Sequence, residues 1–144
     1  MNARIKRFLL AYVVAAVIFA VIDLVWITQV AVKQYDNYIP DLMAPSVNLA
    51  GGAVFYLIYV VGMVHFGVQP NNADATLRKR LTGAALFGFF TYATWSLTGL
   101  AVLKGFPAIV AITDIAWGVV ACTLVTWLTV LVLGKIHRSP KTVQ

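Results

Sequence analysis

The stretch Val21-Ile22-Asp23-Leu24-Val25-Trp26 places a carboxylate inside an apolar run that extends from about residue 8 to residue 32. Hydrophobic residues make up 61% of the chain and charged residues 11%, against about 45–50% and about 25% in soluble domains. Lipid is therefore the expected solvent. A carboxylate near the centre of a bilayer costs roughly 2.5–3.5 kcal/mol on insertion scales, so the stretch predicts a transmembrane helix and a reason for its acid.

Three further apolar runs follow, and the chain of 144 residues has room for four spans of about 20 residues each. The predicted fold is an all-α four-helix transmembrane bundle in one domain, residues 1–144, with helices at about 8–32, 47–68, 81–103 and 108–133. The turn Lys104-Gly105-Phe106-Pro107 is so short that the last two helices should be antiparallel neighbours. The last helix repeats the opening pattern as Asp114-Ile115-Ala116-Trp117.

The first two helices are separated by a polar and aromatic segment, residues 33–46, in which Pro40 and Pro45 forbid a continuous helix. Tyr35 and Tyr38 are expected at the membrane boundary. Either Ser46 or Asn48 could cap the next helix. The basic start of the chain is similar to a signal peptide, but the apolar run is too long for one, so a retained helix is expected. A frayed tail is expected over residues 134–144.

Basic residues are distributed unevenly around the four spans. Nine lie before the first helix, between the second and third, or after the fourth: Arg4, Lys6, Arg7, Arg78, Lys79, Arg80, Lys135, Arg138 and Lys141. Only Lys33 and Lys104 lie on the other side. The positive-inside rule then predicts that both termini are cytoplasmic, in a multi-pass protein of the bacterial inner membrane.

Polar groups of the four helices should meet in one layer, in the outer half of the membrane. At 1.5 Å per residue, Asp23 lies about 13–14 Å from the outer end of its helix, and Asp114 about 9–12 Å from the end of its own. The expected ligand-binding residues of this layer are Asp23, Trp26, Tyr56, Tyr59, Tyr92, Trp95, Ser96, Asp114 and Trp117.

The sequence leaves two interpretations of the role of Asp23 and Asp114 open. If they meet, one would keep its proton, which would suit acid–base chemistry, a proton relay or a cationic ligand. Alternatively, each acid only hydrogen-bonds neighbouring side chains and fixes the bundle. Trp26 and Trp117, one turn from the acids, could stack a ligand or pack as ordinary indoles.

Other classes of site have less support. His65 has no second His or Cys at ligand spacing, so no metal site is expected, and no motif indicates a cofactor. The single cysteine, Cys122, should be a small core residue. The charge of +6 is not arranged as a basic face with interleaved aromatic residues, so nucleic acid is not an expected partner.

Four motifs together resemble the DUF2177 family of small bacterial inner-membrane proteins of unknown function. They are Ile22-Asp23-Leu24-Val25-Trp26, Met43-Ala44-Pro45 with Asn48-Leu49, Phe55-Tyr56-Leu57-Ile58-Tyr59-Val60, and Asp114-Ile115-Ala116-Trp117-Gly118. The resemblance implies a membrane location and four helices, and supplies no activity. The chain departs from the family where Ser96 replaces an expected acid and Gly99 an expected amide, which implies altered chemistry if the family uses three acids.

The function expected from these observations is binding or transport of a small polar or lipidic molecule. A lipid-modifying enzyme with Asp23 and Asp114 as acid and base is an alternative, although no nucleophile–base pair or nucleotide motif accompanies them. A structural or accessory subunit is another. The expected partners are the bilayer, a small-molecule or lipid ligand and, through the small-residue patch Gly51-Gly52, a second copy of the chain.

Overall fold

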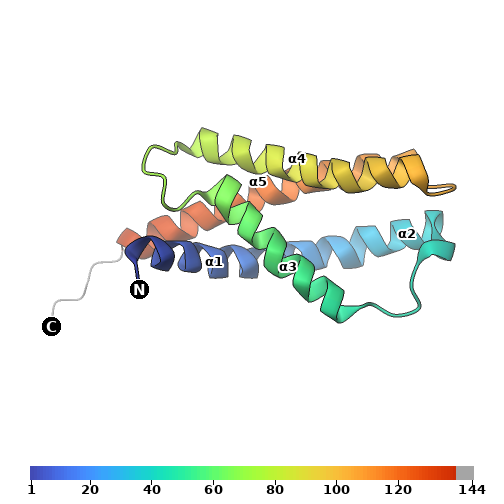
Figure 1. Cartoon of the computed structure of the whole chain (residues 1–144), viewed down its shortest axis with the longest axis horizontal. Helices are drawn as coiled ribbons and strands as arrows, with labels where there is room; N and C mark the ends of the chain where they lie inside the picture. The colour runs from blue at the N-terminus through green and yellow to red at the C-terminus, as the bar shows by residue number, and fades with distance from the viewer. Residues whose placement is uncertain (139–144) are drawn as a thin grey trace.

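The computed structural model describes residues 1–138, with side chains up to residue 136, as a bundle of long helices (Figure 1). The described chain contains four helical segments long and apolar enough to cross a membrane, as predicted. Their elements in order are α1 (Ala3–Trp26), the π-helical turn η1 (Ile27–Ala31), α2 (Val32–Tyr38), the short 3-10 helix η2 (Pro40–Leu42), α3 (Leu49–Met63), the π-helical turn η3 (Val64–Val68), α4 (Leu77–Val102) and α5 (Ala108–Arg138).

The helix ends differ from the predicted ones by four to six residues at both ends of the first helix, at the start of α4 and at the end of α5. The first helix continues without a break to Tyr38, so the non-helical prediction for residues 33–38 was wrong. It stops just before Pro40, because a proline disfavours helical backbone at the preceding residue. The third helix begins at Leu77, where the hydroxyl of Thr76 accepts a hydrogen bond from the backbone N–H of Lys79.

Asn48, and not Ser46, caps α3. Its side-chain oxygen accepts a hydrogen bond of 3.0 Å from the backbone N–H of Gly51. The atoms nearest to a Cβ added at Gly51 would be those of the Asn48 side chain, and a Cβ added at Gly52 would meet no atom within 4 Å. Of the tail that was predicted to fray, residues 134–138 continue α5. Residues 139–144, which include Lys141, lie outside the described residues.

The α4–α5 pair is the most closely packed part of the bundle, in agreement with the predicted antiparallel pairing. At the crossing, a Cβ on Gly88 would lie 2.0 Å from the carbonyl oxygen of Gly118, and a Cβ on Gly118 would lie 2.4 Å from the ring of Tyr92. Glycine at both positions therefore allows the two backbones to touch, which is how helices associate in lipid. The contact fixes Tyr92 against α5.

Helix α1 faces the bundle through every fourth residue: Ala11, Ala15, Phe19 and Asp23 are all buried. The ring of Phe19 packs against Tyr56 and Tyr59 of α3, with centroids 5.2 and 5.5 Å apart. The spacing of four residues explains why α1 presents Asp23 inward.

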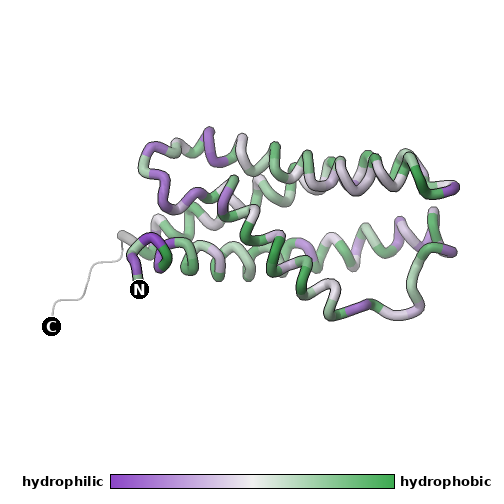
Figure 2. The backbone as a smooth tube through the Cα atoms, viewed as in Figure 1, coloured by the Kyte–Doolittle hydropathy of each residue, from purple (hydrophilic) through white to green (hydrophobic). Residues whose placement is uncertain are grey.

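One end of the bundle holds the N-terminus, residues 69–76 and the end of α5, and we call it the N-terminal end (Figure 1). The opposite end holds α2, η2 and the α4–α5 turn, and we call it the far end. Hydrophilic residues gather at the N-terminal end and near α2 (Figure 2). Helix α3 packs on α4 mainly through η3 and diverges from α4 toward the far end (Figure 1).

Candidate functional site

Asp23 is buried at the centre of three helices, with 4% of its surface exposed. Its Oδ1 accepts a hydrogen bond of 3.0 Å from the indole Nε1 of Trp117 on α5. Its Oδ2 accepts a short hydrogen bond from the hydroxyl of Tyr56 on α3. The carboxylate therefore ties α1 to α3 and α5 through two neutral donors.

Asp114 lies on α5, nearer the far end, and is also 4% exposed. Its Oδ2 accepts a hydrogen bond of 2.5 Å from the hydroxyl of Tyr35 on α2. One position earlier, the hydroxyl of Thr113 donates to the side-chain oxygen of Gln34 at 3.0 Å. These two contacts hold α2 against α5.

The two acids thus point into the bundle, as predicted, but each has its own tyrosine. Among the described residues, no hydrogen bond joins Asp23 to Asp114, and no lysine, arginine or histidine pairs with either carboxylate. No described group donates to Oδ1 of Asp114. The site therefore differs from a carboxyl dyad that shares one proton.

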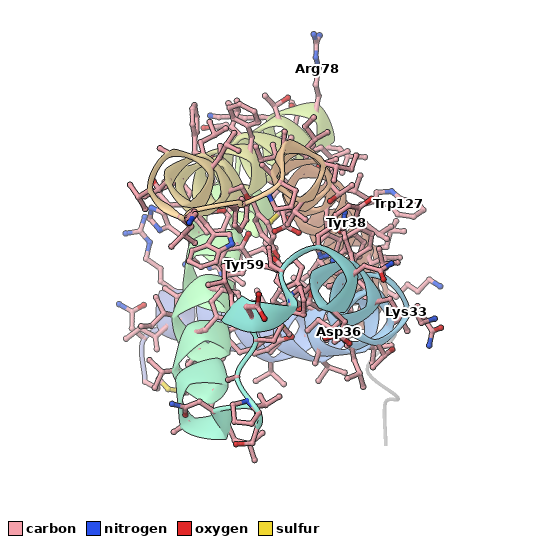
Figure 3. The ribbon with its side chains drawn as sticks, turned by 90° about the vertical axis from the view of Figure 1, so that its right-hand side faces the viewer. Lys33, Asp36, Tyr38, Tyr59, Arg78 and Trp127 are labelled. Atoms are coloured by element: carbon pink, nitrogen blue, oxygen red, sulfur yellow. The ribbon has the colours of Figure 1, made fainter. Side chains whose placement is uncertain are left out.

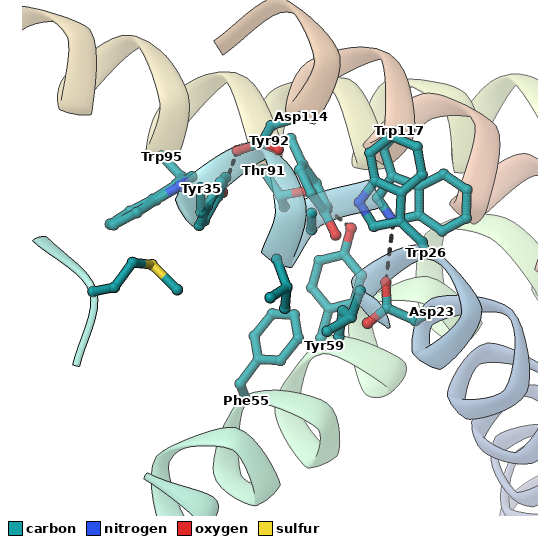
Figure 4. Close-up of a pocket in the computed structure, with 14 residues that line it drawn as sticks. Asp23, Trp26, Tyr35, Phe55, Tyr59, Thr91, Tyr92, Trp95, Asp114 and Trp117 are labelled. Atoms are coloured by element: carbon teal, nitrogen blue, oxygen red, sulfur yellow. Dashed lines mark hydrogen bonds between the residues drawn. The ribbon is translucent and has the colours of Figure 1, made fainter. Parts of the chain in front are cut away.

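Both carboxylates lie at the wall of a cavity of about 510 Å³ (Figure 4). Such a volume falls within the range of small-molecule sites, about 300–1,000 Å³. All the membrane-spanning segments contribute to its lining, which is mostly aromatic and aliphatic: Asp23, Trp26, Ile27, Ala31, Val32, Tyr35, Met43, Phe55, Tyr59, Thr91, Tyr92, Trp95, Asp114 and Trp117.

Trp26 and Trp117 stack on each other beside Asp23, with ring centroids 4.4 Å apart and planes within 3°. The stacked pair forms one side of the cavity (Figure 4). The stacking fixes the plane of the Trp117 ring, and its hydrogen bond to Asp23 fixes the rotation of the ring within that plane. The two indoles thus act as one rigid aromatic wall.

Tyr59 lies in the middle of the bundle when the molecule is viewed from the far end, whereas Lys33 and Trp127 lie at its periphery (Figure 3). The Tyr59 hydroxyl is 3.2 Å from the hydroxyl of Thr91 and 3.1 Å from the sulfur of Cys122. These contacts place the floor of the cavity between α3, α4 and α5. Cys122 is fully buried there.

Seven of the nine predicted site residues line the cavity, and two do not. Tyr56 lies outside the lining and donates its hydroxyl to the Asp23 carboxylate. Ser96 is fully buried, has no hydrogen-bond partner for its hydroxyl, and lies outside the lining. Trp95 is 57% exposed and forms the rim.

Tyr35 is the functional residue that the sequence pattern concealed. An α-helix turns by about 100° per residue, so twelve residues would place Tyr35 about 120° around the axis from Asp23. The π-helical turn η1 lies between them and takes up one additional residue, which reduces the angle to about 20°. Tyr35 therefore shares the face of Asp23 and reaches Asp114, where a boundary position was predicted.

Phe55 was also missed, because an apolar side chain in a transmembrane helix is typical of a lipid-facing residue, and Met43 was missed because it belongs to the segment between the first two helices. No group of three or more His, Cys, Asp or Glu within the described part of the chain could hold a metal ion. His65 belongs to η3 near the N-terminal end, away from both acids.

The fold and the site define a multi-pass membrane protein with a cavity inside the helix bundle that acidic and aromatic residues line. The chain belongs to the DUF2177 family of predicted membrane proteins, whose profile matches residues 8–131.

A second similarity covers part of the chain. It is 30% identical over 88 residues to the fluoride-specific ion channel FluC of Citrifermentans bemidjiense. The match covers 60% of this chain and 66% of that protein. No solved structure matches the chain.

Proposed function

We propose that the protein binds or transports a small molecule in the cavity, with the carboxylates of Asp23 and Asp114 as its polar contacts. The observation that carries the proposal is that two buried carboxylates, held by neutral donors alone, face a cavity of about 510 Å³. Ionisable groups within a membrane are costly and usually mark a ligand or ion pathway. An accessory subunit with a purely structural polar layer would not need the open volume.

The proposed orientation places the N-terminal end in the cytoplasm and the cavity toward the outside of the bacterial inner membrane. The basic residues support it, because Arg4, Lys6 and Arg7 and the 78–80 cluster lie toward the same end of the bundle. A ligand would then reach the cavity from the outer leaflet or from the outside.

Ion conduction is a second candidate, favoured by the similarity to FluC. The acidic lining argues against an anion as the main ligand, since a negative charge on either carboxyl group would repel it. Fluoride release from loaded liposomes, measured with a fluoride electrode, tests this candidate directly. Release that depends on the protein would favour it over small-molecule binding.

The proposal is tested by thermal unfolding of the detergent-solubilised protein with a panel of neutral, cationic and anionic amphiphiles. At least one class should raise the melting temperature of the wild type, because a ligand that binds only the folded state stabilises it. The variant Ala31→Phe, which fills the cavity from η1, should abolish the shift. Ala53→Phe on the exposed surface of α3 is the matched control. Equal shifts in both variants, or none in the wild type, would refute the proposal.

A further inference from the structure

We infer that the ligand of this cavity is an amphiphilic organic cation that enters sideways from the bilayer, between α3 and α4. The inference rests on the proposed function and adds two properties, the charge of the ligand and its route. Each property follows from a separate observation.

The charge follows from the partners of the carboxylates. Asp23 receives only a tyrosine hydroxyl and an indole N–H. Asp114 is 96% buried, receives one tyrosine hydroxyl, and keeps Oδ1 without a donor among the described residues. A cationic group in the cavity would supply the opposite charge that the protein itself does not provide.

The aromatic walls favour the same class of ligand. The stacked pair of Trp26 and Trp117 lies beside Asp23, and Tyr59 and Tyr92 form other parts of the lining. Aromatic faces attract a cation within about 6 Å through their quadrupoles, more strongly when water is excluded. Bulky apolar substituents on the cation would at the same time fill the cavity and bury apolar surface.

The route follows from the divergence of α3. Helix α3 contacts α4 mainly near η3 and moves away from it toward the far end (Figure 1). Phe55 of α3 and Trp95 of α4 lie on opposite sides of the opening (Figure 4) and are 43% and 57% exposed. Exposed side chains at this depth face acyl chains, so the opening admits molecules already dissolved in the membrane.

Side chains cover the far end of the cavity. Tyr35 joins α2 to Asp114, and Ile39 packs with Phe106 and Val110 of the α4–α5 turn and α5. With the far end covered in this way, the side between α3 and α4 is the route that we infer. A ligand that partitions into lipid is therefore favoured over one that arrives from water.

The test uses tetraphenylphosphonium and tetraphenylborate, two lipophilic ions of nearly equal shape and opposite charge, titrated calorimetrically into the full-length protein in detergent. Saturable binding of the phosphonium alone is expected. Asp23→Asn and Asp114→Asn should each weaken it by about tenfold or more, since each removes a charge from a poorly screened site. Asp36→Asn, an exposed acid of α2 outside the lining, should leave it unchanged.

The outcomes separate this inference from the proposed function. Equal binding of both ions, or equal binding by the wild type and both acid variants, overturns the cationic ligand. If neutral amphiphiles then still stabilise the wild type and not Ala31→Phe, the proposed function stands without it. If no amphiphile binds, both fail. Folding of each variant is checked by gel filtration, and a double Asp23→Glu and Asp114→Glu variant, which keeps both charges, should retain the preference for the phosphonium.

The route is tested with the same probe in nanodiscs. Phe55→Cys and Trp95→Cys, joined by a short bis-maleimide in a Cys122→Ala background, should slow phosphonium binding by about tenfold or more, because the linker closes the opening. Unchanged binding rates after complete cross-linking would overturn the lateral route and leave the charge preference to the previous test.

Discussion

Adding one methyl group at the α4–α5 crossing should loosen the wall of the cavity. In Gly88→Ala the new Cβ would lie 2.0 Å from the carbonyl oxygen of Gly118, whereas ordinary contact begins at 3.4 Å. The two backbones must therefore separate by about 1.4 Å or distort. Overpacking of this kind costs typically about 1–3 kcal/mol, and it also releases Tyr92, which packs on Gly118.

The matched control is Gly52→Ala on α3, where the added Cβ meets nothing within 4 Å. Both variants place alanine in a helix and gain the same intrinsic preference, about 1 kcal/mol in water. The difference between them therefore isolates the crowding. We expect Gly88→Ala to be less stable than Gly52→Ala by about 1–3 kcal/mol, measured by reversible unfolding in mixed micelles of increasing dodecyl sulfate content. Equal stability of the two variants would refute the close packing of α4 on α5.

Three further predictions concern α1, the donors of the acids and the orientation. Tyr56→Phe removes a hydroxyl donor from Asp23 and should lower the free energy of unfolding by about 0.6–1.7 kcal/mol, measured in the same micelles; no loss would mean that the bond is not formed in solution. Phe19→Ala empties a fully buried site and should cost about 3–5 kcal/mol, a value that a lipid-facing Phe19 would not approach. For orientation, an impermeant maleimide should label Asp41→Cys in intact cells and Ala73→Cys only after permeabilisation; the reverse pattern would place the termini outside.

The four spans could be predicted because lipid forces each backbone polar group to be satisfied within its own segment, so a long apolar run can only be a helix. The helix ends could not be predicted equally well. Residues 33–38 are polar, but the helix continues through them, because a polar side chain at a membrane surface does not interrupt backbone hydrogen bonds. The helix instead ends at Tyr38, shortly before Pro40.

The acids could be located because a carboxylate in an apolar run is conspicuous. The donors were harder to find. Tyr56 was recognised as a neighbour at the same depth, whereas Tyr35 was not, because a period of 3.6 residues assigns it to another face. Local backbone geometry at η1, which leaves no clear mark in the residue types Ile27-Thr28-Gln29-Val30-Ala31, decided the position of this side chain.

The π-helical turn η1 also determines where the first helix can lose a residue. Removing one residue from Ile27–Ala31 would let this segment revert to a regular α-helix, but removing one near Ala3 would only shorten an exposed end. Asp23 and Tyr35 share one face of this helix. A deletion between them keeps them on that face only if the π-helical turn becomes a regular α-helical turn at the same time. Tolerance to deletions along this helix should therefore depend on position, and the π-helical turn is the point where the chain can adjust.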